Sequence, residues 1–276
     1  WWFRRIFSLP ASEKGKNITL ILHGINYRAN IWLNGILIAD SNHVIGPFRI
    51  FEFDITSHIN YNGPNVLALE VKRPFNPNRR GGDLAIDYAD WIHYPADYNG
   101  GVVNDVEIGT CDKIAVRHPL VTTKFDLPSL AVAHLQVDAQ VINYSASPES
   151  AIIEGKINDQ VSFRKEVHLQ AGESRDISFS PQEFPQLNIR NPRIWWPWQY
   201  GKPLLNTIKL DVIRNGRSGN SVADHFGIRQ VSSEMIDSTA RKFIINGKPI
   251  MLRSAAWSPD IFQRRSAERQ EQEVKL

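Results

Sequence analysis

The chain has 276 residues, of which 42% are hydrophobic and 22% are charged, and its formal net charge is +3. This composition supplies enough apolar side chains for buried cores and excludes an intrinsically disordered chain. The Lys and Arg residues form no basic face with interleaved aromatic residues, so we expect no nucleic-acid partner. No apolar run approaches the roughly 20 residues of a membrane span, so we expect no membrane partner either. The single cysteine, Cys111, excludes an internal disulfide and a thiolate metal site.

The first part of the chain alternates apolar and polar residues with a period of two. Asn34-Gly35 lies between ANIWL and ILIAD, and this dipeptide favours a type I′ hairpin turn because both central residues need a positive φ. Alternating stretches follow at 51–55 and 67–71, and each is typical of a strand with one face on a core. Short strands with such turns predict an antiparallel sandwich.

Residues 81–106, GGDLAIDYADWIHYPADYNGGVVNDV, form a long predicted loop. Loops of this length are uncommon unless they are functional or disordered, and the Trp and Tyr content argues against disorder. Aromatic rings pack on the C–H faces of sugars and carboxylates accept hydrogen bonds from hydroxyls, so the loop suits a carbohydrate. The candidate side chains are Asp83, Asp87, Asp90, Trp91, His93, Tyr94 and Asp97.

A structural role for the same loop stays open. Trp91 and Tyr94 can cap the sandwich while the Asp side chains form turns. We hold both readings open for Asp90 and Trp91 and favour the turn role for the other residues. A catalytic acid pair within the loop is disfavoured, because a glycosidase pair needs a fixed separation of about 5–9.5 Å on rigid supports.

The second part of the chain repeats the alternating pattern. Residues 131–142, AVAHLQVDAQVI, predict a half-buried strand. Residues 194–201, IWWPWQYG, gather four aromatic residues around a proline. Such a cluster can stack on a sugar, but a hydrophobic plug between sheets or domains is the favoured interpretation.

The C-terminal part combines a predicted hairpin with a predicted helix. Asn246-Gly247 separates KFII from PIML, and an apolar strand then leads to Trp257. Ser266 precedes AERQEQEVKL, with Glu268 in the first turn, which predicts a helix with Ser266 as its N-cap. We place domain boundaries near His118-Pro119 and Phe226-Gly227. The predicted domains are 1–117, 118–226 and 227–276.

The segments above resemble motifs of glycoside hydrolase family 2, within it the exo-β-D-glucosaminidase and endo-β-mannosidase branch. The resemblance covers essentially the whole chain, and the motifs follow one another in the family's order. The matching segments are Trp2-Phe3-Arg4, Ile31-Trp32-Leu33-Asn34-Gly35, Ala89-Asp90-Trp91, Gly101-Val102-Val103-Asn104-Asp105-Val106, Trp195-Trp196-Pro197, Phe226-Gly227-Ile228-Arg229, Asn246-Gly247-Lys248-Pro249 and Ser258-Pro259-Asp260-Ile261-Phe262.

The resemblance implies an all-β fold. It implies a jelly-roll, galactose-binding-like sandwich at 1–117, an immunoglobulin-like β-sandwich at 118–226, and the truncated start of a (β/α)₈ barrel at 227–276. It also implies retaining hydrolysis of O-glycosyl bonds, in which one carboxylic acid protonates the leaving oxygen and a second carboxylate forms a glycosyl-enzyme intermediate. In the family both carboxylates come from later barrel strands. We therefore expect no catalytic residue in this chain, and we expect it to lack the first strands of the jelly roll.

The resemblance assigns to this chain residues that are expected to contact the sugar and not to take part in catalysis. Asp90 and Trp91 correspond to the D-W loop, which reaches over the barrel mouth, so Asp90 is expected to bind a sugar hydroxyl or ammonium and Trp91 to stack on the ring. Trp257 lies in the loop after the first barrel strand and is expected to line the same pocket. Ser254-Ala255-Ala256 stands where the glucosaminidase pattern has glycines, and this departure weakens the match at Trp257.

Our leading interpretation is the non-catalytic front part of an exo-β-D-glucosaminidase-like enzyme, inactive by itself. Its expected partners are a β-linked aminosugar or mannoside oligosaccharide and the catalytic barrel of the same polypeptide, without a cofactor or metal. A stand-alone carbohydrate-binding module, a β-mannosidase-type fragment and an immunoglobulin-like scaffold protein are the alternatives. The sugar, the oligomeric state and the compartment stay open, with an extracellular or periplasmic place preferred.

Overall fold

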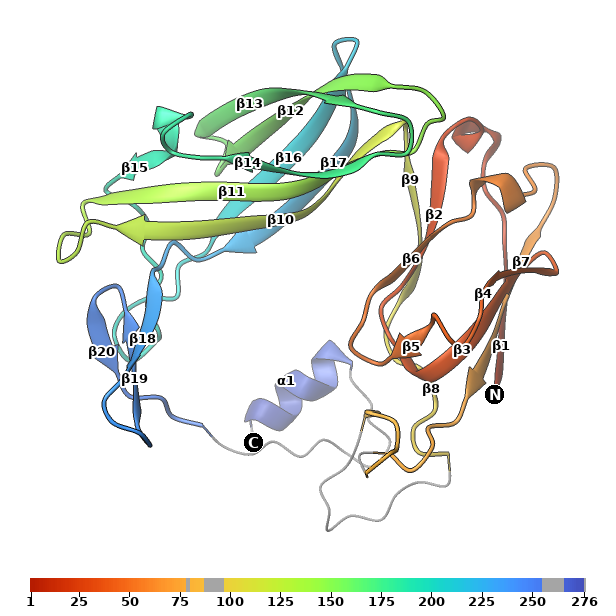
Figure 1. Ribbon diagram of the computed structural model, residues 1–276, viewed down its shortest axis with the longest axis horizontal. Coiled ribbons are helices and arrows are strands. Elements are labelled where there is room, and N and C mark those ends of the chain that lie inside the picture. Colours follow the sequence, from red (N-terminus) through yellow and green to blue (C-terminus); the bar gives the residue numbers. More distant parts are fainter. Residues whose placement is uncertain (78–79, 87–96, 255–265, 276) are drawn as a thin grey trace. The chain divides into compact units, whose positions relative to one another are not determined.

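The computed structural model describes residues 1–77, 80–86, 97–254 and 266–275. The chain divides into two compact units (Figure 1). Unit 1 comprises Trp1–Thr110 together with Ala255–Leu276, and unit 2 comprises Cys111–Ser254. The three-part division that the sequence suggests stays a prediction.

Unit 1 contains a jelly-roll-type sandwich of two sheets (Figure 1). The first sheet has the order β1-β7-β3-β4, with β5 and β8 also paired to β3, and the second has the order β6-β2-β9. Ile31 and Leu69 from the first sheet and Leu20 from the second are buried in one shared core. The strands are β1 (Trp2–Phe7), β2 (Asn17–Leu22), β3 (Ile25–Leu33), β4 (Ile36–Ala39), β5 (Ile45–Gly46), β6 (Phe51–Asp54), β7 (Asn65–Lys72), β8 (Gly101–Val102) and β9 (Val106–Cys111), with 3₁₀ turns η1 (Ala11–Glu13) and η2 (Thr56–His58).

Unit 2 contains an immunoglobulin-like sandwich with longer strands. One sheet has the order β10-β11-β14, with β15 also on β11, and the other has the order β13-β12-β16-β17 (Figure 1). The strands are β10 (Ile114–Phe125), β11 (Val132–Asn143), β12 (Glu149–Ile157), β13 (Val161–Leu169), β14 (Ser174–Phe179), β15 (Asn188–Arg190), β16 (Asn206–Arg214) and β17 (Arg217–Phe226), with the 3₁₀ turn η3 (Pro185–Leu187).

The alternating pattern at 131–142 forms β11, and its apolar positions face the core. Ala133, Leu135, Val137, Ala139 and Val141 are at most 4% exposed, whereas Gln136 between them is exposed. The predicted strand and its buried face are therefore confirmed.

The predicted Asn-Gly turns are also confirmed. Asn34-Gly35 joins β3 to β4, and its φ angles are 52° and 84°. Asn246-Gly247 likewise has positive φ at both residues, and so does Asn215-Gly216, which joins β16 to β17. Both central residues of a type I′ turn need this conformation, so the sequence signal and the backbone agree.

The C-terminal elements are a three-stranded meander and a short helix. The meander consists of β18 (Val231–Met235), β19 (Arg241–Ile245) and β20 (Lys248–Ile250). The helix α1 covers Ala267–Lys275. The hydroxyl of Ser266 accepts a hydrogen bond from N–H of Arg269 at 3.3 Å, which confirms the predicted N-cap. None of the helices within the described ranges is long and apolar enough to cross a membrane.

Candidate functional site

The three side chains predicted to contact sugar, Asp90, Trp91 and Trp257, lie outside the described residues. Asp87, His93 and Tyr94 of the same loop also lie outside them. The structure does describe the chain on both sides of 87–96, and the two flanks show how this segment is attached to unit 1.

Asn26 is the side chain that binds both flanks. It lies on β3 and is completely buried. Its Nδ2 donates hydrogen bonds to the carbonyl oxygens of Tyr98, at 3.3 Å, and Asn99, at 3.0 Å. Its Oδ1 accepts a hydrogen bond from N–H of Ile86 at 3.3 Å. One buried amide therefore holds the chain just before and just after the 87–96 segment.

Asp83 makes a second attachment on the leading flank. Its Oδ1 lies 3.0 Å from Nη2 of Arg28, which is on β3, and its Oδ2 accepts a hydrogen bond from N–H of Phe75 at 2.9 Å. N–H of Asp83 donates in turn to the carbonyl oxygen of Phe75. Both carboxylate oxygens are thus bound within the protein. Asp83 therefore holds the loop in place, and its carboxylate is not available to bind a sugar.

Asp97 has a comparable structural role on the trailing flank. Its Oδ1 accepts a hydrogen bond from N–H of Asn99 at 3.0 Å, and its carbonyl oxygen accepts one from N–H of Gly100. The guanidinium of Arg73 lies over the ring of Tyr98, 4.9 Å from its centroid. The turn role that the sequence favours for Asp83 and Asp97 therefore agrees with their contacts.

The aromatic cluster at 194–201 is partly buried and partly exposed. Trp195 and Trp196 are half-buried, and cations lie over both rings: Arg229 is 4.2 Å from the centroid of Trp195, and Lys248 is 5.2 Å from that of Trp196. Trp198 is 73% exposed. Trp195 and Trp196 pack within unit 2, as a hydrophobic plug does, whereas Trp198 does not.

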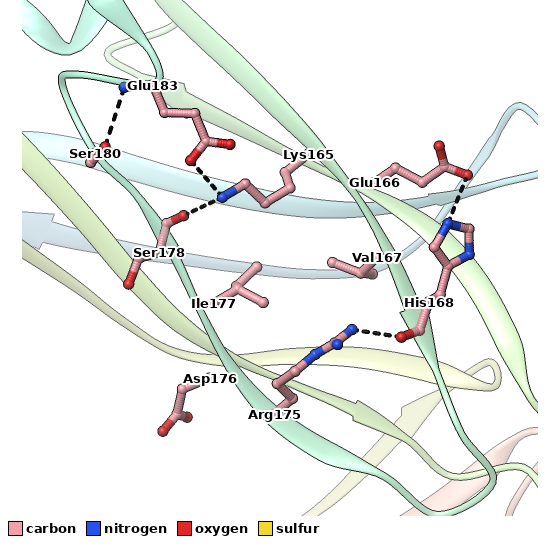
Figure 2. Close-up of a pocket in the computed structure, with 10 residues that line it drawn as sticks. All are labelled: Lys165, Glu166, Val167, His168, Arg175, Asp176, Ile177, Ser178, Ser180 and Glu183. Atoms are coloured by element: carbon pink, nitrogen blue, oxygen red, sulfur yellow. Dashed lines mark hydrogen bonds and ion pairs between the residues drawn. The ribbon is translucent and has the colours of Figure 1, made fainter.

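A cavity of about 510 Å³ forms a groove between β13 and β14 of unit 2 (Figure 2). Nζ of Lys165 donates to the carbonyl oxygen of Ser178 at 2.7 Å and contacts Glu183 at 2.8 Å. Nη2 of Arg175 donates to the carbonyl oxygen of His168 at 2.6 Å. The cations thus satisfy main-chain groups at two open sheet edges, a common way to protect edge strands. We assign this groove a structural role.

No group of three or more His, Cys, Asp or Glu side chains that could hold a metal ion occurs among the residues that the structure describes.

The sequence indicates a functional loop at 81–106 but gives no sign of the residues that hold its flanks. Asn26 and Arg28 lie inside a predicted strand, and a polar residue there does not reveal which distant groups it binds.

Two family models match the chain. The model described as "Glycosyl hydrolase 2 galactose-binding domain-like" matches residues 1–93, and the model "Glycosyl hydrolases family 2" matches residues 114–229. The chain belongs to glycosyl hydrolase family 2. The matches fall on the jelly-roll-type sandwich of unit 1 and on the immunoglobulin-like sandwich of unit 2.

Individual family members resemble the chain over nearly its whole length. An exo-β-D-glucosaminidase from Streptomyces avermitilis is 33% identical over 264 residues, which are 96% of this chain and 28% of that protein. A mannosylglycoprotein endo-β-mannosidase from Lilium longiflorum is 27% identical over 283 residues, covering 93% of this chain and 29% of the relative.

The fold also matches a solved structure of an exo-β-D-glucosaminidase. A solved structure of the exo-β-D-glucosaminidase CsxA superposes with a TM-score of 0.89 at 28% identity, covering 100% of this chain and 31% of that one. The chain therefore spans less than a third of the length of these relatives.

Proposed function

We propose that the chain is the non-catalytic front part of a retaining β-glycosidase that removes β-D-glucosamine units from the ends of chitosan-type oligosaccharides. The observation that carries the proposal is the match to exo-β-D-glucosaminidase sequences across 96% of the chain. The identity to the endo-β-mannosidase is lower, 27% against 33%. The glucosamine branch is therefore preferred over a mannoside enzyme.

The role proposed for this part is to shape the sugar subsite. Asp90 would accept hydrogen bonds from a sugar hydroxyl or pair with the ammonium of an aminosugar, and Trp91 would supply a stacking wall. Trp257 would line the same pocket. The attachment of both flanks of 87–96 to the buried Asn26 supports this role, because a binding loop needs a fixed base to present its side chains.

Catalysis would need an acid and a nucleophile from a barrel beyond Leu276. A (β/α)₈ barrel takes about 250 residues, so the C-terminal part of this chain can hold no more than its entry. We propose that the chain by itself has no hydrolytic activity. A coding region downstream of Leu276 that encodes barrel carboxylates at the ends of the fourth and seventh strands would support the proposal.

A stand-alone carbohydrate-binding module is the second candidate, favoured by the galactose-binding-like sandwich of unit 1. Calorimetric titration with glucosamine oligomers separates the two. A front part that supplies only one wall of a subsite is expected to show no saturable binding at millimolar concentrations. Millimolar or tighter binding by the isolated chain would favour the module.

A further inference from the structure

A second cavity of unit 2, of about 500 Å³, has a cationic side chain and no carboxylate among its lining residues. It lies where β10 and β17 meet the start of β18 and the segment around Trp195. Its charged or ionisable lining side chains are Arg229 and His225, and no carboxylate lines it. The lining residues are Val121, Thr122, Thr123, Trp195, Leu205, His225, Phe226, Gly227, Arg229 and Val231.

Arg229 is the central cation of this cavity. Its guanidinium lies over the indole of Trp195, with 4.2 Å between the guanidinium carbon and the ring centroid. It has no ion pair with any residue in the part of the chain that the structure describes. Stacking restrains the plane of a guanidinium and leaves the N–H groups on its edge free, and their fork geometry fits a carboxylate.

The Trp195–Arg229 stack has a rigid base. N–H of Trp195 donates to the carbonyl oxygen of Ile228 at 3.0 Å, and Nδ2 of the buried Asn246 donates to that of Trp195 at 3.1 Å. A Cβ atom at Gly227 would lie 2.8 Å from Cβ of Trp195, so the indole packs where only a glycine leaves room. The stack is therefore held before any ligand arrives.

The rim of the cavity is apolar. Leu205 and Val231 line it and are 50% and 58% exposed. Thr123 also lines the cavity, but its Oγ1 is buried and not accessible to solvent. The cavity therefore combines a guanidinium that has no ion pair among the described residues with an apolar rim.

We propose that this cavity binds a carboxylate carried on a short aliphatic arm. The carboxylate would accept hydrogen bonds from Arg229, and the arm would lie against Leu205 and Val231. All the residues that line this site belong to unit 2, and the proposal does not depend on glycosidase function.

The test uses butyrate as the probe and inorganic phosphate as the comparison, both at constant ionic strength with the 276-residue chain. Side-chain NMR signals of Trp195 Nε1–H and Arg229 Nε–H are expected to shift saturably with butyrate. Arg229→Gln is expected to weaken binding about tenfold or more, equivalent to about 1.4 kcal/mol.

Arg217→Gln is the matched control, because it removes the same charge from β17 at a residue that does not line the cavity. It is expected to leave the butyrate affinity unchanged. An equal loss in Arg217→Gln, phosphate binding as tight as butyrate, or no saturable shift in the wild-type chain would each overturn the proposal. The NMR shifts of the wild-type chain with butyrate and with phosphate test the proposal even if Arg229→Gln fails to fold.

Discussion

At the scale of single residues, Glu149 is the most heavily paired acid of unit 2. Its carboxylate on β12 contacts both Lys113 and Arg214, and the side chain is 12% exposed. The hydrogen bond from Lys113, followed by the charge of Arg214, holds the pKa of Glu149 below its usual value. Glu149 therefore joins the strand β12 to β16 and to the segment before β10.

We expect Glu149→Gln to lower the free energy of unfolding by about 1–2 kcal/mol, because two cations lose their shared carboxylate. The lowered pKa of Glu149 makes its contribution to the free energy of unfolding depend on pH. The contribution of Glu149 is present above the unfolded-state pKa, near 4.5, and is lost as the pH falls through the lower folded-state pKa. Urea unfolding at pH 7 and pH 3 checks both points. An equal stability difference between wild type and variant at the two pH values would contradict them.

His134 is a second paired residue, and its pH dependence has the opposite sign. Nδ1 lies 2.6 Å from Oδ1 of Asn188, and Nε2 lies 3.0 Å from Oδ2 of Asp126. Both partners are acceptors, so only the imidazolium can donate to both at once. These hydrogen bonds, that to Asn188 foremost, raise the pKa of His134 above its usual value.

The stabilisation from His134 is expected to be complete below pH 6.5, the unfolded-state pKa, and to disappear as the pH rises through the higher folded-state pKa. Thermal unfolding between pH 5.5 and pH 8.5 should therefore show the wild type losing stability relative to His134→Gln. A gap between the two proteins that stays constant over this range would count against the account.

At the scale of elements, one side chain, Asn26, binds both flanks of the 87–96 segment. Asn26→Ala removes both donors and the acceptor that hold the two flanks. We expect a loss of about 1–3 kcal/mol in the free energy of unfolding, because buried partner groups are left unsatisfied. Hydrogen exchange at the Ile86 amide should also become faster.

Asn26→Asp is the matched control for this change. It keeps an acceptor for N–H of Ile86 and removes the donors to the carbonyl oxygens of Tyr98 and Asn99. The Ile86 amide is therefore expected to stay protected in Asn26→Asp and to lose protection in Asn26→Ala. Equal exchange rates in wild type and Asn26→Ala would show that Asn26 does not hold the leading flank.

The element scale also shows what the sequence can predict. The strand at 131–142, the Asn34-Gly35 hairpin and the N-cap at Ser266 depend on local spacing and turn chemistry, and all three are confirmed. The Asn26 contacts connect residues 60 to 73 positions apart. Such pairings follow from the packed fold and have no local sequence signal.

At the scale of the whole molecule, the order of the segments is what identifies the family. Two antiparallel sandwiches follow one another, each with its own core. Alternation and turn signals predict the sandwiches, and the family motifs predict which kinds they are. The proposed sugar-contacting residues, Asp90, Trp91 and Trp257, stay predictions, because they lie outside the described residues.

We propose that this chain supports a sugar subsite and supplies neither the acid nor the nucleophile of hydrolysis. Release of nitrophenol from p-nitrophenyl β-D-glucosaminide by the purified 276-residue chain tests it most directly. The expected result is a rate equal to that of the buffer alone, with circular dichroism confirming folded β-structure. Saturable turnover that co-purifies with the chain at constant specific activity would contradict the claim.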